Sequence, residues 1–253
     1  MKILVTGGVA AGTKTAAKLK RENRSAEVTL ITKSTDISYA GCGLPYYVGG
    51  LIEEREELVV NTPEKFSALT GVQVLTKREA VALHAEEKTV EAKNLENGET
   101  ETYTYDRLVI TVGASPADLP IEGMDKNGIF KMRTPDDAAG IRSYIEEKHV
   151  KKAVVIGAGF IGLEAAENLK AKGVTVTVID FADQVLPEIL DSEMANYVKK
   201  HLRNQGIRVL TGTKAEAILG EDQVTGIRTS AGTLPCELII AAAGIRPNTA
   251  FLA

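Results

Sequence analysis

Residues 153–162 read AVVIGAGFIG, a β-branched run that leads directly into a complete G-x-G-x-x-G pattern. An Ala/Leu-rich helical stretch follows over residues 161–172, and a second apolar strand covers residues 174–180. In such a βαβ unit the glycines allow a tight turn, close approach of a pyrophosphate to backbone N–H groups, and close packing of helix on strand. These glycines are Gly157, Gly159 and Gly162. The sequence therefore predicts a dinucleotide site here.

Asp180 ends the second strand of this unit. A carboxylate placed about 20 residues after the glycines accepts hydrogen bonds from a ribose 2′-hydroxyl. It also repels a 2′-phosphate, and no arginine lies beside it. The sequence therefore favours NADH over NADPH at this site.

The same plan appears in the first half of the chain. Residues 2–8 form a β-branched run that ends in the turn GGVAAG at residues 7–12, and a helical stretch and a second strand follow. Val9 occupies the middle glycine position, and the second strand ends in Thr32 rather than in an acid. One interpretation is a diverged, empty copy. The duplication favours a second functional site.

Each half also carries short alternating segments with polar turns, over residues 79–105 and 215–234, and then a strand that runs into glycine. Prolines and glycines interrupt any periodicity over residues 114–133, where we place the domain boundary. The predicted fold class is α/β, with two Rossmann-like dinucleotide-binding folds, each with a parallel sheet and a small antiparallel β-meander.

Cys42 lies in residues 38–46, a segment that the second half lacks. Pro45 suits the first turn of a helix, and a thiol at a helix N-terminus has a lowered pKa, which favours the nucleophilic thiolate. A buried structural cysteine is the alternative for a lone thiol. The small residues beside it favour close approach of a large flat group, so Cys42 is the candidate redox residue.

Composition excludes several classes of protein. The net charge of −4 over 253 residues is spread along the chain, so we expect no nucleic-acid partner and no membrane association. The apolar run at residues 1–5 is too short, and too quickly followed by glycines, for a signal peptide, so we expect a cytoplasmic protein. The three histidines show no metal-ligand spacing, so no metal is expected. Three basic residues share one helical face, either to meet an anionic substrate or as a solvated face: Lys14, Lys18 and Arg21.

These motifs together resemble the single-cysteine branch of the pyridine nucleotide-disulfide oxidoreductases, which includes coenzyme A-disulfide reductases, NADH oxidases, NADH peroxidases and polysulfide reductases. The resemblance runs along essentially the whole chain. Its strongest parts are GGVAAG (residues 7–12), SYAGCGLPYY (38–47), YDRLVITVGASP (105–116), GAGFIGLE (157–164) and GIRPN (244–248). It implies an FAD-binding domain over residues 1–115 that contains Cys42, an NAD(P)H-binding domain over 116–244, and a return segment that begins at 245–253.

The resemblance also assigns residues one by one. It places the FAD diphosphate on the first turn, at Gly7, Gly8, Val9, Ala10, Ala11 and Gly12. Further flavin contacts fall at Thr32, Lys33, Cys42, Val81, Thr111, Val112, Gly113 and Arg133. In the second fold it implies that Phe160 gates the nicotinamide pocket, that Glu164 lies near the flavin and that Gly244 lines the nicotinamide side. Ile161 is a further expected cofactor-binding residue. Ser38 and Arg21 match coenzyme A contacts, with Lys14 and Lys18 beside them. Thr32 stands where the family carries an acid.

The resemblance favours transfer of electrons from NADH through FAD to Cys42 and then to a disulfide or polysulfide such as coenzyme A disulfide. Val9 and Ala10 favour this branch, because the peroxidases and many oxidases carry a histidine in the first turn. The alternatives are an NADH oxidase or peroxidase that uses a Cys42 sulfenic acid, and a truncated, non-catalytic NADH-binding module. Family members continue into a dimerisation domain, so we expect a C-terminally truncated chain whose parent is a homodimer.

Overall fold

A computed structural model describes residues 1–252, and Ala253 lies outside the described residues. The chain divides into two compact units. The first contains residues 1–40, 59–115 and the C-terminal segment from Arg246 onward. The second contains residues 41–58 and 116–245.

The first unit is built on a parallel sheet with the strand order β3-β2-β1-β7. Its strands are β1 (Lys2–Thr6), β2 (Glu27–Ile31), β3 (Gln73–Leu75) and β7 (Arg107–Ile110). Its helices are α1 (Ala10–Glu22), α3 (Pro63–Thr70) and the short 3-10 turn η3 (Ala250–Leu252). An antiparallel meander of β4 (Arg78–His84), β5 (Thr89–Asn94) and β6 (Thr100–Thr104) completes the unit.

The sheet of the first unit is covered on both faces. Val5 and Leu30 pack on one face, in a core that also holds Phe66 of α3. Leu4 and Ile31 point to the other face, where they pack with residues of the meander such as Val90. Because successive strand residues point to opposite faces, this apolar sequence produces three layers, helices, sheet and meander.

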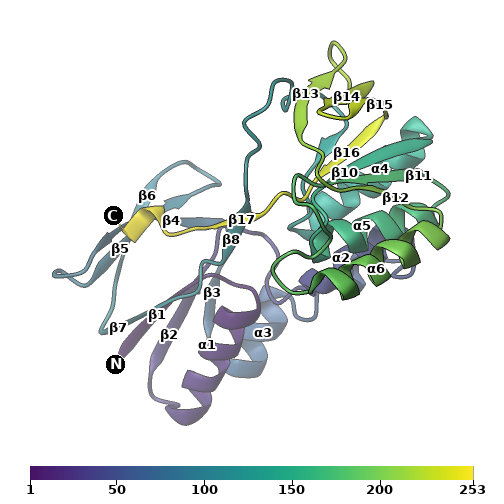
Figure 1. Cartoon of the computed structure of the whole chain (residues 1–253). Coiled ribbons are helices and arrows are strands. Elements are labelled where there is room, and N and C mark those ends of the chain that lie inside the picture. The colour runs from purple at the N-terminus through teal and green to yellow at the C-terminus, as the bar shows by residue number, and fades with distance from the viewer. Residues whose placement is uncertain (253) are drawn as a thin grey trace. The chain divides into compact units, whose positions relative to one another are not determined.

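The second unit repeats this plan with the parallel strand order β12-β11-β10-β16-β9 (Figure 1). Its strands are β9 (Ile129–Phe130), β10 (Lys152–Ile156), β11 (Thr175–Ile179), β12 (Arg208–Leu210) and β16 (Leu238–Ala241). Its helices are α2 (Leu44–Gly49), α4 (Pro135–Lys148), α5 (Phe160–Ala171) and α6 (Ser192–Asn204), with 3-10 turns η1 (Gly41–Gly43) and η2 (Arg55–Leu58). The meander consists of β13 (Ala215–Leu219), β14 (Gly226–Thr229) and β15 (Gly232–Pro235).

The second unit has the same three layers as the first: helices, sheet and meander. Val155 and Val178 face the helices, whereas Val154 and Ile179 face the meander. In Figure 1 the β13–β15 meander lies across the sheet from α5 and α6. The predicted fold class, two α/β folds that each have a parallel sheet and a small meander, is therefore confirmed.

The segment 41–58 differs from its sequence-based assignment. The sequence analysis placed it with the first domain, whereas in the structure it packs within the second unit. Leu44, Val48 and Leu58 are buried in the core that α4 and α5 share. An added Cβ at Gly49 would overlap the side-chain oxygen of Asn168 on α5, so glycine at this residue lets α2 approach α5 closely. The burial of these apolar side chains, rather than the position of the segment in the sequence, therefore decides which unit residues 41–58 join.

Two short strands pair outside the main sheets, β8 (Ala114–Pro116) and β17 (Ile245–Pro247). The backbone then continues into the first unit, where the side-chain amide of Asn248 donates to the Val112 carbonyl at 3.0 Å and its oxygen accepts from the Ser115 hydroxyl at 2.7 Å. No helix among residues 1–252 is both long enough and apolar enough to cross a membrane.

Candidate functional site

The two glycine-rich turns occupy the same place in their sheets. The Gly7 N–H donates to the Ile31 carbonyl at 2.8 Å, and the Gly157 N–H donates to the Ile179 carbonyl at 2.8 Å. Each turn therefore leaves the central strand and passes the carboxyl end of the neighbouring parallel strand. In open α/β sheets, ligands bind at this edge.

Contacts within the protein account for two of the three glycines in the second turn. Gly157 has φ +112°, and a side chain there would overlap the Ala242 carbonyl. A side chain at Gly162 would overlap the Gly157 carbonyl. By contrast, a Cβ at Gly159 would meet no atom within 4 Å. The protein itself does not require glycine at residue 159, whereas a pyrophosphate that approaches the backbone does.

Asp180 holds this turn in place. Its carboxylate accepts hydrogen bonds from the N–H groups of Ala158 at 2.6 Å and Ala182 at 2.8 Å. The side chain is buried beside the turn, so its position is fixed before any ligand arrives. A carboxylate offers about four acceptor sites, and two are used here. It can therefore accept further bonds from ribose hydroxyls.

The remaining residues predicted for the second fold lie on two segments. Phe160 and Ile161 begin α5, and both side chains are exposed. Glu164 lies one turn further along the same helix and is half-buried. Gly244 follows β16 with φ +100° and is exposed. Exposed apolar side chains at a helix N-terminus beside a glycine-rich turn form a surface suited to a flat ring.

The first turn is also tightly built. A side chain at Gly12 would overlap the Gly7 carbonyl, and one at Gly7 would overlap the carbonyl of Thr111. Gly8 is buried, with Thr32 Cγ2 2.9 Å from where its Cβ would lie. Val9 is the N-cap of α1. The other members of the turn lie in the first turn of α1, Ala10 and Ala11, and both are exposed.

A cavity of about 220 Å³ opens beside this first turn. Its walls come from the ends of β1 and β2, from β4, and from the C-terminal segment. The lining residues are Thr6, Gly7, Ile31, Thr32, Lys33, Arg78, Glu79, Ala80, Val112, Asn248, Ala250 and Phe251. Gly7, Thr32, Lys33 and Val112 were predicted from the sequence, so the structure brings these four together.

Thr111 and Gly113 complete the edge of this site. The Thr111 N–H and hydroxyl both donate to the Thr6 carbonyl, each at 2.8 Å, which holds the end of β7 against β1. The Gly113 carbonyl accepts from the N–H of Asn248 at 3.0 Å. The predicted segment 111–113 therefore joins the first turn to the C-terminal segment.

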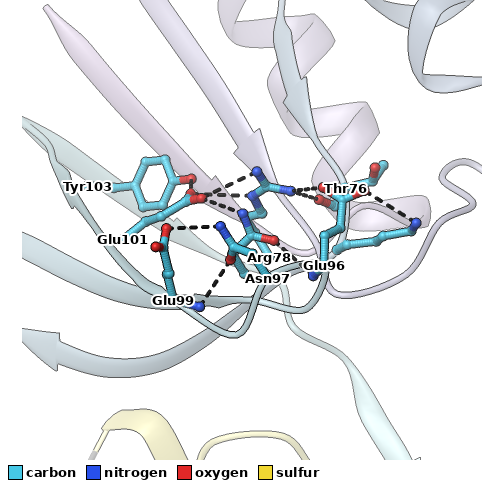
Figure 2. Close-up of polar contacts among 9 residues, drawn as sticks. Thr76, Arg78, Glu96, Asn97, Glu99, Glu101 and Tyr103 are labelled. Carbon is cyan, nitrogen blue, oxygen red and sulfur yellow. Dashed lines mark hydrogen bonds and ion pairs between the residues drawn. The ribbon is translucent and has the colours of Figure 1, made fainter.

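Arg78 belongs to a polar network on the meander of the first unit (Figure 2). Its guanidinium donates to the Glu96 carboxylate at 2.9 Å and to the Thr76 carbonyl at 3.1 Å, and it pairs with Glu101. The Tyr103 hydroxyl also donates to Glu101. Because Glu96, Thr76 and Glu101 all hold the guanidinium, the side chain forms a fixed wall of the cavity.

This network shifts the pKa values of its members. The bond from Arg78 lowers the pKa of Glu96, and bonds from Tyr103 and Asn94 lower the pKa of Glu101. Desolvation, together with the Glu101 carboxylate, raises the pKa of Tyr103 to about 12. Each shift favours the charge state in which the network is formed.

The two cysteines have different surroundings. Both are free thiols, with Cys42 exposed in η1 and Cys236 buried before β16. Burial raises the pKa of Cys236 to about 12, which keeps it protonated. Cys42 is therefore the accessible thiol of the two, and access is what a redox role requires.

The remaining predicted residues are spread over several elements. Ser38 has φ +51°, and its backbone N–H donates to the Gly8 carbonyl at 2.9 Å. On α1, Lys18 pairs with Glu22 at 2.6 Å, and two other basic side chains are exposed, Lys14 and Arg21. Val81 on β4 and Arg133 before α4 do not line the cavity. Among residues 1–252 no group of three or more His, Cys, Asp or Glu side chains is arranged to hold a metal ion.

Several lining residues were not predicted from the sequence. Glu79 and Arg78 lie on β4, and Phe251 lies in the C-terminal segment. The sequence carries no local signal for Glu79, because its place beside the first turn depends on the long-range backbone hydrogen bond from Arg78 to Thr32.

Comparisons with known proteins agree with this architecture. The family model described as pyridine nucleotide-disulphide oxidoreductase matches residues 1–253. An NADH oxidase of Methanocaldococcus jannaschii is 36% identical over 248 residues, which cover 98% of this chain and 55% of that protein. The coenzyme A disulfide reductase of Staphylococcus haemolyticus is 34% identical over 206 residues, which cover 81% of this chain and 46% of that protein.

Comparison with solved structures also finds a relative with the same fold. The NAD-dependent persulfide reductase from A. fulgidus is 40% identical with a TM-score of 0.95, and the match covers 99% of this chain and 47% of that chain. The chain thus spans about half the length of the relatives that it matches. The fold, the duplicated turns and these matches show that the chain belongs to the pyridine nucleotide-disulphide oxidoreductase family.

Proposed function

We propose that this chain is the nucleotide-binding part of an FAD-dependent NAD(P)H:disulfide oxidoreductase. The observation that carries the proposal is the duplication of one phosphate-binding turn in two compact folds, together with an exposed cysteine in the one inserted segment. When bound, a flavin accepts two electrons from a reduced nicotinamide and passes them to a disulfide.

The first fold is suited to FAD. The tight turn at residues 7–12 presents helix N-terminal amides to a diphosphate, and the adjacent cavity of about 220 Å³ can take an adenosine group. Lys33 and Val112 line this cavity, as the resemblance implies for flavin contacts. The residues present therefore fit the group.

The second fold is suited to NADH. The open space in front of Gly159 admits a pyrophosphate, and Asp180 is fixed where ribose hydroxyls arrive. A buried carboxylate repels a 2′-phosphate, which supports NADH over NADPH. Phe160 and Ile161 offer an exposed apolar surface to the nicotinamide end.

Cys42 supplies the thiol chemistry. Its thiolate attacks one sulfur of a substrate disulfide, RSSR, forms the mixed disulfide with Cys42 and releases RS⁻. Two electrons then cleave the mixed disulfide and return the Cys42 thiolate and a second RS⁻. Overall, RSSR, NADH and one proton give two RSH and NAD⁺.

Small disulfides or polysulfides are the proposed substrates, with coenzyme A disulfide as the example. Relatives are named as coenzyme A disulfide reductase and persulfide reductase. Lys14 and Arg21 are exposed on α1 and can meet an anionic substrate, and Ser38 lies near the first turn. For the whole protein we propose a homodimer in the cytoplasm, where free thiols such as these two persist.

A single-turnover experiment tests the proposal. The 253-residue chain is loaded with FAD, reduced anaerobically with NADH, and followed through the flavin absorbance. We expect NADH to bleach the flavin and coenzyme A disulfide to restore its colour, with two thiols released per disulfide. Cys42→Ser is expected to retain the bleaching and to lose the restoration.

Three outcomes overturn the proposal or change it. If the chain holds no flavin, the first turn is an empty copy. If Cys42→Ser reduces coenzyme A disulfide as fast as the wild type, Cys42 is not the redox group. If only oxygen or peroxide restores the colour, the activity is that of an NADH oxidase or peroxidase.

A further inference from the structure

The internal duplication allows the two nucleotide sites to be compared position by position. The Thr32 N–H donates to the Leu75 carbonyl at 3.0 Å, and the Asp180 N–H donates to the Leu210 carbonyl at 3.0 Å. Both residues directly follow the second strand of their sheet, so Thr32 and Asp180 occupy equivalent positions.

The same comparison extends into the meanders. The Arg78 N–H donates to the Thr32 carbonyl at 2.9 Å, and the Thr213 N–H donates to the Asp180 carbonyl at 2.7 Å. The next residue in the first copy is Glu79, and the next residue in the second copy is Lys214. Glu79 and Lys214 are therefore also equivalent.

The two copies thus carry their carboxylate on different strands. The second copy has Asp180 at the end of β11 and a lysine at the start of its meander. The first copy has a neutral Thr32 at the end of β2 and a glutamate at the start of its meander. Each copy keeps one carboxylate at this pair of positions.

Thr32 cannot replace the missing acid, because it carries no carboxylate and its side chain is buried. It is 7% exposed, and its methyl group packs against Gly8, where an added Cβ would lie 2.9 Å from Thr32 Cγ2. Glu79 instead lines the cavity, and its Oε1 lies 3.6 Å from the Lys33 ammonium. Among the described lining residues of this cavity, Glu79 is the one carboxylate.

We propose that Glu79 binds the ribose hydroxyls of the adenosine group in the first copy, and that Lys33 positions its carboxylate. This inference rests on the proposed function, because it takes the bound dinucleotide to be FAD. The ion pair with Lys33 engages one oxygen and leaves acceptor sites for a pair of neighbouring hydroxyls. A charge-assisted hydrogen bond of this kind changes affinity by about 10-fold or more.

Calorimetry on the 253-residue chain tests the inference. The chain contains no tryptophan, so FAD binding is followed by heat or by flavin fluorescence. Two ligands are compared, FAD and an analogue whose adenosine ribose is 2′,3′-dideoxy. The variants are Glu79→Gln, Lys33→Met and Glu87→Gln, the last removing an exposed carboxylate of the same meander outside the cavity.

The wild type is expected to bind FAD about 10-fold more tightly than the dideoxy analogue. Glu79→Gln should lose this preference by weakening FAD alone, Lys33→Met should lose part of it, and Glu87→Gln should keep it. Thermal midpoints of all variants should stay close to that of the wild type, because the Lys33–Glu79 pair is exposed.

The outcomes separate the two proposals. If the wild type binds no FAD, the proposed function fails, and the role of Glu79 fails with it. If the wild type binds FAD but Glu79→Gln keeps the full preference, only the role of Glu79 is wrong. Equal binding of FAD and the dideoxy analogue by the wild type overturns that role without any variant.

Discussion

The Ala158 backbone N–H donates to the Asp180 carboxylate at 2.6 Å, so the acid that we propose for the ribose also holds the second glycine-rich turn. We expect Asp180→Asn to weaken NADH binding by about 10-fold, because an amide accepts hydrogen bonds less strongly than a carboxylate. NADPH binding should stay constant or improve, because a negative charge is removed. Calorimetric dissociation constants for both nucleotides measure this change.

Glu188→Gln is the matched control, since it removes an exposed carboxylate from the loop that follows β11. It should leave the NADH to NADPH ratio unchanged. An unchanged ratio in Asp180→Asn would show that the acid serves the turn alone.

Gly159 and Gly162 predict opposite consequences for the same substitution. Gly159→Ala should leave the thermal midpoint within about 1–2 °C of the wild type, because its Cβ meets nothing, and should weaken NADH binding about 10-fold. Gly162→Ala should destabilise the fold by about 2 kcal/mol or more, because its Cβ overlaps the Gly157 carbonyl. Thermal denaturation and NADH titration distinguish the two. A Gly159→Ala variant with wild-type affinity would mean that no pyrophosphate approaches this residue.

The two thiols should differ in reactivity. At pH 8, 5,5′-dithiobis(2-nitrobenzoate) should modify Cys42 at least about 100-fold faster than Cys236, because burial keeps Cys236 protonated with a pKa of about 12. Cys42→Ser should abolish the fast phase, and Cys236→Ser should retain it. A fast phase that persists in Cys42→Ser would show that Cys236 becomes accessible.

The network around Arg78 predicts a dependence of stability on pH. The pKa values of Glu96 and Glu101 are lower in the folded chain than the reference value of 4.5, so their contribution is present above that pH and is lost as the pH falls. The contribution of Tyr103 to stability depends on pH in the opposite direction. Its pKa rises from 10.0 to about 12, so its contribution is present below pH 10 and is lost as the pH rises towards 12.

Thermal midpoints between pH 3 and pH 7 check the acid side. Arg78→Met should flatten the decline below about pH 5, because the carboxylates lose the partner that lowers their pKa. Arg24→Met, at an exposed arginine, should leave the decline unchanged. Equal declines in both variants would contradict the assignment to this network.

The sequence predicts some parts of the fold directly and misses others for identifiable physical reasons. The glycines of the second turn could be recognised because sterics fix their spacing, as the overlap of a Gly162 side chain with the Gly157 carbonyl shows. Glu79 could not be recognised from its own surroundings. Its place beside Lys33 depends on the register between Arg78 and Thr32, which is a long-range property of the backbone.

Segment 41–58 gives the second lesson. Its sequence position suggests the first domain, but its apolar side chains are buried with α4 and α5. No local pattern indicates which of two similar cores an amphipathic segment joins. The cavity wall at Phe251 depends in the same way on a chain segment far away in sequence.

The same segment determines how the protein can be divided for expression. A single cleavage after Ser115 would leave Leu44, Val48 and Leu58 attached to a piece that lacks their packing partners. That piece would expose apolar surface and tend to aggregate. To express the first domain alone, residues 41–58 must be replaced by a short polar linker, and the segment from Arg246 must be fused back. The two halves of this duplication therefore cannot be separated by one cut in the chain.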